Sequence, residues 1–209
     1  MTVEEFLAQW NDASPCMEVK TSGSTGVPKR IYIEKVRMRA SARMTCDFLG
    51  LHQGDTALLC MPLDYIAGKM MVVRALESGM RLLSVEPSSH PLCSTNMESI
   101  GNPSCIDFAA MVPLQVWNTL RVPEERERLH HIKHLIIGGG AIPQELEQEL
   151  RTIPINVWSS YGMTETLSHI ALRRISEDYY SPLPDISLSQ DQDDCLIINA
   201  PSLCAQTLY

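Results

Sequence analysis

Short apolar segments alternate with helical patterns along most of this chain, and this alternation limits the fold more than any other feature. The segments with the length and apolar content of strands are residues 30–34, 55–62, 80–86, 106–112, 134–140 and 155–160. Helical patterns lie between them at residues 36–50, 67–79, 113–120 and 143–151. Strands that alternate with helices build βαβ units. The sequence therefore predicts an α/β fold with mostly parallel sheets and flanking helices.

The pattern changes near Ile175. The stretch that follows, SEDYYSPLPDISLSQDQDDCLIINAP, is broken by prolines and is typical of short antiparallel strands. We therefore expect an α/β core at residues 1–174 and the start of a β-rich subdomain at residues 175–209. Residues 86–104 are rich in proline, serine and asparagine, which indicates a polar connection within the core.

Composition narrows the function classes. The chain has 209 residues and a net charge of −8 without a basic cluster, which argues against nucleic acid or an anionic membrane as a main partner. No apolar run approaches the roughly 18 residues that span a bilayer, and the acidic start MTVEEFLAQW is unlike a signal peptide. These features favour a cytoplasmic location without membrane insertion. The seven cysteines include no CxxC pair, which suits reduced thiols.

The histidine cluster HHIKH, with His130, His131 and His134, is the one metal-like motif formed by histidines. No cysteine lies close to it, and the segment has the pattern of a strand edge. Metal binding there is disfavoured.

Three loops follow strand ends, where open α/β sheets place ligands. The first, TSGSTGVPK at residues 21–29, offers backbone N–H groups, hydroxyls and the Lys29 ammonium, which suit an anion with several oxygens such as a polyphosphate. Gly23 and Gly26 allow close backbone approach. The loop is neither a P-loop nor a GxGxxG turn. On composition alone, a flexible Ser/Gly linker remains open.

The second loop is GGGAIP, residues 138–143, whose open backbone could lie against a flat ring, although a tight strand-to-helix turn has the same composition. The third is YGMTET, residues 161–166, which combines an aromatic ring, hydroxyls and the Glu165 carboxylate. A carboxylate beside phosphate-binding hydroxyls calls for a divalent cation such as Mg²⁺. Taken singly, Glu165 is typical of a helix N-terminus.

Together, TSGSTGVPK and YGMTET resemble the two signatures of the adenylate-forming enzymes, which include acyl-CoA synthetases, peptide-synthetase adenylation domains and luciferases. The resemblance covers residues 18–208. It implies that the substrate carboxylate attacks the α-phosphorus of ATP, giving an acyl-adenylate that is transferred to a thiol such as that of coenzyme A. No protein nucleophile is needed, because positioning and charge stabilisation can lower the barrier.

The resemblance also assigns roles to residues. It places the ATP phosphates on Thr21, Ser22, Gly23, Ser24, Thr25, Gly26 and Lys29. The adenine would lie between Tyr161 and the segment Gly139, Gly140 and Ala141. Gly162 and Met163 belong to the nucleotide-binding signature, Thr164 would touch the α-phosphate, and Glu165 would hold Mg²⁺. Lys29, Thr164 and Glu165 are thus the expected catalytic residues.

The chain departs from the family pattern at both ends. Only twenty residues precede the first loop, where members of the family usually carry many more. The chain stops at Tyr209, before the ribose-binding aspartate, the hinge and the C-terminal lid domain that the resemblance implies. We therefore expect the core of a large N-terminal domain, with the lid domain absent from this chain.

The acid substrate is expected beside MPLDYIAGKMM, where the family lines its acyl pocket. Tyr65, Gly68 and Lys69 fall there, and His169 is a further candidate. Lys69 suits an acid with a second carboxylate, although a solvated lysine and a structural His169 are equally compatible with the pattern. Three features, namely DYIAGKMMVVRAL, the brief N-terminus and YGMTETLSHIALR, together most resemble the short o-succinylbenzoate–CoA ligases of menaquinone synthesis.

Two alternatives stay open at this point. Asp64 could pair with a substrate amine in an amino-acid adenylating domain, and the chain could be an ATP-binding module without activity of its own. The sequence is compatible with a homodimer.

Overall fold

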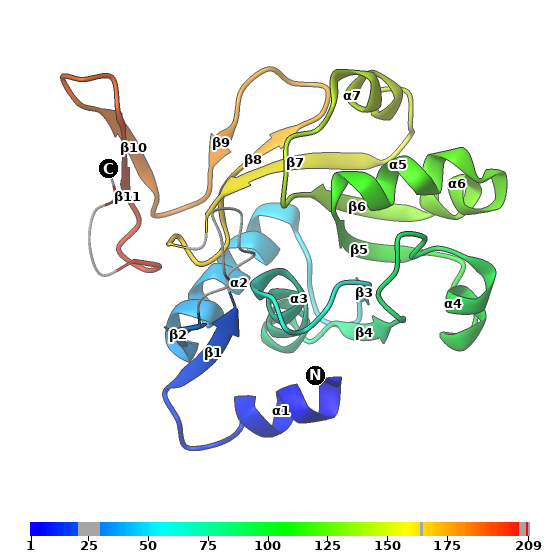
Figure 1. Ribbon diagram of the computed structural model, residues 1–209, viewed down its shortest axis with the longest axis horizontal. Coiled ribbons are helices and arrows are strands. Elements are labelled where there is room, and N and C mark those ends of the chain that lie inside the picture. Colours follow the sequence, from blue (N-terminus) through cyan, green and yellow to red (C-terminus); the bar gives the residue numbers. More distant parts are fainter. Residues whose placement is uncertain (21–29, 164, 205–207, 209) are drawn as a thin grey trace.

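The large sheet has the strand order β4-β3-β5-β6-β7-β8-β9 in the computed structural model, which describes residues 1–20, 30–163, 165–204 and 208 (Figure 1). Its strands are β3 (Thr56–Leu59), β4 (Arg81–Ser84), β5 (Ile106–Met111), β6 (Ile132–Ile137), β7 (Asn156–Gly162), β8 (His169–Arg174) and β9 (Ser181–Pro182). Pairing is parallel from β4 to β7 and antiparallel from β7 to β9. The predicted α/β fold with a mostly parallel sheet is confirmed.

Helices cover both faces of this sheet. Helices α2 (Lys35–Leu49) and α3 (Ile66–Ser78) pack on each other on one face, and α5 (Pro113–Arg121), α6 (Pro123–Leu129) and α7 (Gln144–Leu150) lie on the other (Figure 1). The right-handed crossover rule explains why the helices divide between the two faces. The chain runs from β3 to β4 through α3 in one direction across the sheet. It runs from β5 to β7 through α5, α6 and α7 in the opposite direction, so these helices lie on the other face. Parallel strands covered on both faces are apolar throughout, as the fully buried β3 is.

An N-terminal unit adds α1 (Val3–Trp10) and an antiparallel hairpin of β1 (Cys16–Lys20) and β2 (Arg30–Glu34). The predicted strand at residues 30–34 is present, but it pairs with β1 and lies outside the large sheet. Lys20 pairs with Arg30 at the end of the hairpin, so these two residues flank the first glycine loop. That loop, residues 21–29, lies outside the described residues.

Near the C-terminus, β10 (Ser187–Gln190) and β11 (Leu196–Asn199) form an antiparallel hairpin, as the sequence predicts for this part of the chain. Strand β9 belongs to the large sheet. The division into residues 1–174 and 175–209 stays a prediction. A short helix that the sequence did not predict, α4 (Ser94–Ser99), interrupts the polar connection at residues 86–104.

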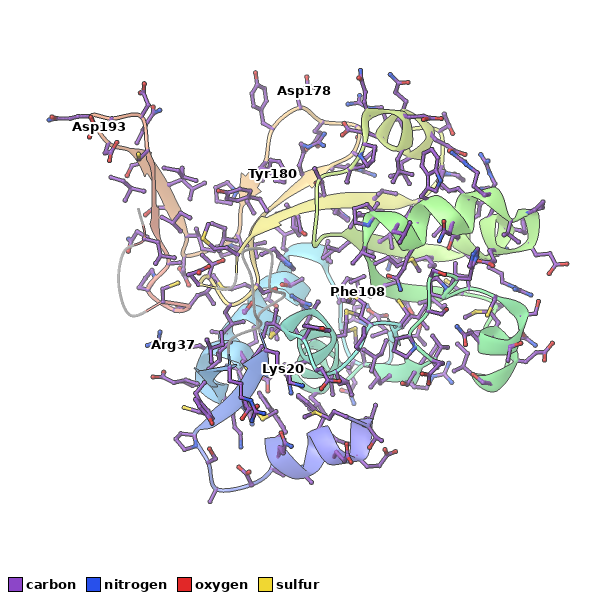
Figure 2. The ribbon with its side chains drawn as sticks, in the orientation of Figure 1. Lys20, Arg37, Phe108, Asp178, Tyr180 and Asp193 are labelled. Atoms are coloured by element: carbon purple, nitrogen blue, oxygen red, sulfur yellow. The ribbon has the colours of Figure 1, made fainter. Side chains whose placement is uncertain are left out.

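The hydrophobic core lies between the sheet and its helices. Phe108 on β5 is completely buried and sits centrally in the molecule (Figure 2). Helix α3 is buried over most of its length, with Met70, Met71, Val72 and Val73 all in the core, because it lies between α2 and the sheet. Among the residues that the structure describes, no helix has both the length and the hydropathy required to cross a bilayer.

Candidate functional site

The parallel strands β5, β6 and β7 end at one edge of the sheet, and two of the predicted loops begin there. Met111 pairs with Ile137, and Ile137 pairs with Ser159, so the three strand ends are in register. The Gly138 amide donates to the Met111 carbonyl at 3.1 Å, which fixes the start of the GGGAIP loop. The structure thus brings residues 138–143 beside residues 161–163.

The glycine loop requires its glycines at two positions. A Cβ on Gly138 would collide with the Ser160 hydroxyl, which itself donates to the Ile137 carbonyl at 3.1 Å. Gly139 has a φ of +81°, in the left-handed region that favours glycine. A Cβ on Gly140 would meet nothing within 4 Å, and Ala141 is exposed. The backbone of residues 139–141 is therefore open to a ligand.

Tyr161 lies beside the glycine loop at this edge of the sheet. It is the last residue but one of β7 and is 39% exposed, and its ring packs edge-to-face on Tyr180 with 6.0 Å between centroids. Side chains alternate along a strand, so Tyr161 shares a face with Ser159, while Trp158 packs on Phe48 of α2 on the opposite face. Tyr161 therefore lies on the same face of the sheet as α7, the helix that follows the glycine loop. Adenine binding by these residues stays a prediction.

The YGMTET segment turns sharply after β7. A Cβ on Gly162 would lie within 3.0 Å of backbone atoms of Ser168 and His169, so no larger residue fits without displacing the strand. Buried Thr166 fastens the turn, because the Met163 amide donates to its hydroxyl at 3.0 Å. Thr164 lies outside the described residues. Thr166, which had no predicted role, is the residue that shapes this loop.

Glu165 is exposed on this turn. The Cys204 thiol donates to its backbone carbonyl at 3.2 Å, which ties the turn to the segment after β11. Its carboxylate makes no ion pair with any described residue and so remains available to a cation. Within the same ranges, no group of three His, Cys, Asp or Glu side chains could hold a metal without help from a ligand. One free carboxylate suits Mg²⁺, which usually takes its other ligands from phosphates and water.

His169 lies at the start of β8, where it is 8% exposed. Its Nε2 is 2.9 Å from the Thr45 hydroxyl, which donates its own proton to the Ser41 carbonyl at 3.0 Å. Nε2 must therefore carry the ring hydrogen and donate it to Thr45. Burial, with a smaller effect of the Arg74 charge, holds the pKa of His169 well below its ordinary value of 6.5. His169 is a neutral, hydrogen-bonded residue of the core.

Arg74 on α3 lies next to this histidine and had no predicted role. It is 3% exposed, donates to the Ser168 hydroxyl at 3.0 Å, and its Nε has no partner among the described residues. Desolvation lowers its pKa to about 10, so the guanidinium is charged at neutral pH. A buried charge without a carboxylate is costly. The signal in the sequence was an arginine inside the apolar run MMVVRAL.

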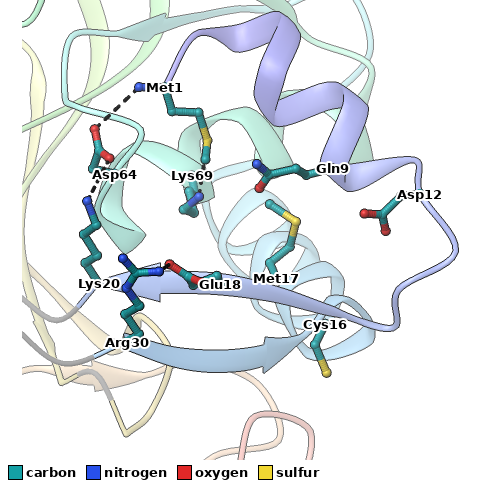
Figure 3. A pocket seen from close by; sticks show the side chains of 10 residues that line it. All are labelled: Met1, Gln9, Asp12, Cys16, Met17, Glu18, Lys20, Arg30, Asp64 and Lys69. Atoms are coloured by element: carbon teal, nitrogen blue, oxygen red, sulfur yellow. Dashed lines mark hydrogen bonds and ion pairs between the residues drawn. The ribbon is translucent and has the colours of Figure 1, made fainter.

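Of the other predicted acyl-site residues, Tyr65 caps α3 and is 41% exposed, and Gly68 packs against the Pro62 carbonyl with no room for a side chain. Lys69 points away from His169. Its ammonium lies 3.4 Å from the Met1 sulfur (Figure 3). The same ammonium is 5.7 Å from the centre of the Phe6 ring. Burial lowers the pKa of this ammonium.

Lys69 lines a cavity of about 390 Å³ between α1, the β1–β2 hairpin and the start of α3 (Figure 3). Arg74 is five residues further along α3, roughly 140° around the helix, and faces Ser168 instead. Helix α3 thus presents one buried cation to α1 and another to β8. Lys69 and His169 were both expected at the acyl site, and the structure does not bring them into one cluster. Asp64 already pairs with Lys20 at 3.4 Å, so its carboxylate is engaged.

Comparison with known proteins decides the family. The profile described as AMP-binding enzyme matches residues 8–194. The chain belongs to the AMP-binding enzyme family. Among the curated relatives of this AMP-binding enzyme, the 2-succinylbenzoate–CoA ligase of Escherichia coli (strain K12) is 29% identical over 181 residues, which cover 85% of this chain and 37% of the relative. That of Bacillus cereus is 29% identical over 161 residues, which cover 77% of this chain and 32% of the relative.

Solved structures agree on the fold of the AMP-binding enzyme. The acyl-CoA synthetase (AMP-forming)/AMP-acid ligase II-like protein from Dyadobacter fermentans DSM 18053 superimposes with a TM-score of 0.88 and 33% identity, over 98% of this chain and 58% of that one. An o-succinylbenzoate coenzyme A synthetase from Bacillus subtilis, in complex with ATP and magnesium ion, gives 0.72 at 23% identity, over 91% and 42% of the two chains. The chain spans about a third of the length of the two curated 2-succinylbenzoate–CoA ligases.

Proposed function

We propose that this chain is the ATP-binding part of an ATP-dependent acid–thiol ligase, which activates a carboxylate as its acyl-adenylate and transfers the acyl group to coenzyme A. One observation carries the proposal. The open backbone at residues 139–141, the Tyr161 ring and the turn bearing Glu165 meet at the carboxyl edge of the parallel sheet of an AMP-binding enzyme. Family membership and the names of the relatives support the reaction class.

The ATP site in this proposal uses all three loops. Adenine lies between Tyr161 and residues 139–141, and the phosphates reach residues 21–26 and Lys29, which are outside the described residues. Lys20 and Arg30 lie at the two ends of that loop, where Asp64 and Glu18 pair with their charges. Glu165 would hold Mg²⁺, which, when bound, neutralises part of the phosphate charge. Thr164, beside Glu165, is proposed to contact the α-phosphate.

The acid is proposed to lie between α3 and the start of β8. Arg74 is the cation best placed to bind a second carboxylate there, because its buried guanidinium has donor capacity that the described residues leave unused. An acid with two carboxylates, such as the o-succinylbenzoate named for the relatives, would compensate that charge. His169 stays neutral and supports Ser168, so its role is to shape the site.

The reaction needs no nucleophile from the protein. A carboxylate oxygen of the acid bonds to the α-phosphorus as the bond to the pyrophosphate oxygen breaks, and the thiol sulfur of coenzyme A later displaces AMP from the acyl carbon. The contribution of the chain is positioning and charge stabilisation. Asp64 does not favour an amino-acid substrate, because Lys20 occupies its carboxylate. A cytoplasmic location and a homodimer stay predictions.

Acid-dependent exchange of labelled pyrophosphate into ATP tests the proposal. With the full-length protein, o-succinylbenzoate should support exchange, whereas benzoate and free amino acids should not. Arg74→Met keeps the bulk of the side chain and should abolish exchange while the fold remains, because removing an uncompensated buried charge does not destabilise a core. The matched control is Arg43→Met, since Arg43 is a surface partner of Glu77. Exchange with no acid of this class would refute the proposal.

A further inference from the structure

Tyr180, in the connection between β8 and β9, lies against the candidate adenine site although no sequence motif marks it. Its ring packs on Tyr161 with 6.0 Å between centroids and 61° between planes. Its hydroxyl lies 2.6 Å from the hydroxyl of Ser159, two residues before Tyr161 on the same face of β7. Tyr180 therefore contacts this strand twice, at the ring and at the hydroxyl.

An ion pair between Arg173 and Glu147 links Tyr180 to α7, the helix that follows the glycine loop. The Arg173 guanidinium lies 5.5 Å from the centre of the Tyr180 ring and donates to both carboxylate oxygens of Glu147, at 2.9 and 2.8 Å. The Glu147 carboxylate raises the pKa of Arg173, so the guanidinium stays charged. Glu147 belongs to α7, which begins directly after the glycine loop. One set of contacts therefore joins the glycine-loop helix, β8, Tyr180 and Tyr161.

The contact between the Tyr161 and Tyr180 rings differs from ordinary core packing. Tyr161 and Tyr180 are 39% and 40% exposed, so neither ring belongs to the buried core. The contact does restrict the Tyr161 ring, because an edge-to-face partner favours one orientation of a side chain that would otherwise rotate. The adjacent Tyr179 is 85% exposed. The connection itself therefore does not hold a tyrosine against the sheet, and the position of Tyr180 depends on its own contacts.

We propose that Tyr180 is a positioning residue for the nucleotide, which holds the Tyr161 ring in the orientation that stacks on adenine. This inference rests on the proposed function. A ring already oriented before ATP arrives loses less conformational freedom on binding, so Tyr180 contributes to affinity without touching the base. The effect is expected in the Kd for ATP and not in the chemical step.

The test measures the ATP Kd of the chain by calorimetry, with the melting temperature recorded for every variant. Tyr180→Ala should raise the Kd about fivefold, the size of one lost aromatic contact. Tyr180→Phe keeps the ring and should restore most of the affinity. Tyr179→Ala is the matched control and should leave the Kd unchanged. In a Tyr161→Ala background, Tyr180→Ala should have no further effect, because the two residues act through one ring.

The outcomes separate the two proposals. ATP binding by the wild-type chain with an unchanged Kd for Tyr180→Ala would overturn the positioning role and leave the proposed function intact. A Tyr180→Ala effect that persists in full without Tyr161 would also overturn it, since Tyr180 would then act directly or through the fold. No ATP binding by the wild-type chain would overturn both.

Discussion

Replacing His169 by Gln is expected to make the protein less sensitive to acid. The imidazole is buried, and its Nε2 donates to Thr45, whose own proton is committed to Ser41. A second proton would have to sit on Nδ1, which faces the Ser168 hydroxyl, and would place a second buried positive charge near Arg74. The folded protein therefore resists protonation of His169, and burial is the main reason that its pKa lies well below 6.5.

The sign and size of the effect follow from proton linkage. In the unfolded chain the pKa of His169 has its ordinary value of 6.5. As the pH falls through this value, the unfolded state binds a proton that the folded state does not bind. The free energy of unfolding therefore falls with pH. Between about pH 7.5 and about pH 5, this single histidine can remove at most about 2 kcal/mol. In His169→Gln the amide can still donate to Thr45, but it does not titrate.

Urea denaturation at the two pH values measures the difference. Wild type should lose up to about 2 kcal/mol more than His169→Gln on acidification. His134, whose pKa is also lowered, chiefly by burial, is present in both proteins and cancels. His131→Gln, at an exposed histidine, controls for the loss of an imidazole. Equal losses in wild type and His169→Gln would show that the folded protein accommodates the proton and that the hydrogen-bond scheme is wrong.

Four further outcomes are expected. Gly162→Ala should lower stability by about 1–3 kcal/mol, because its Cβ meets backbone, whereas Gly140→Ala should be tolerated; equal melting temperatures would contradict the geometry of the turn. Glu165→Gln should slow Mg²⁺-dependent adenylation by the full-length enzyme on the order of 10²-fold or more, and a wild-type rate would remove the metal role. Lys29→Ala should weaken ATP binding by no more than about 3 kcal/mol, and unchanged affinity in calorimetry would count against the phosphate role. With ATP present, o-succinylbenzoate should raise the melting temperature more than benzoate or an amino acid does, and a larger shift with an amino acid would favour the Asp64 alternative.

The parallel strands were predictable because their apolar pattern is local. Strands β5 and β6 are buried on both faces and are bounded by polar or glycine-containing segments. Helices α4 and α6 were missed because they are short and polar, and tertiary contacts hold them. Glu125 of α6, for example, is 4% exposed and lies 3.0 Å from the ring nitrogen of His90. Such contacts between distant segments leave no pattern in the local sequence.

The loops of the candidate site were predictable because glycine and hydroxyl residues after a strand predict an open backbone at its end. The directions of the buried cations were not predictable, because they depend on tertiary contacts: Lys69 lies against Phe6 of α1, and Arg74 donates to Ser168 in the turn before β8. The N-terminal helix was missed even though its sequence carries a signal, since Thr2 and Glu5 form the capping box that begins it.

Binding of ATP by this chain tests the central claim most directly. We predict that calorimetric titration with ATP and Mg²⁺ gives one saturable site, that AMP competes for it, and that Glu165→Gln removes the dependence on Mg²⁺ without lowering the melting temperature. Absence of ATP binding at millimolar nucleotide, or binding that Glu165→Gln leaves equally dependent on Mg²⁺, would contradict the assignment of this sheet edge as the nucleotide site.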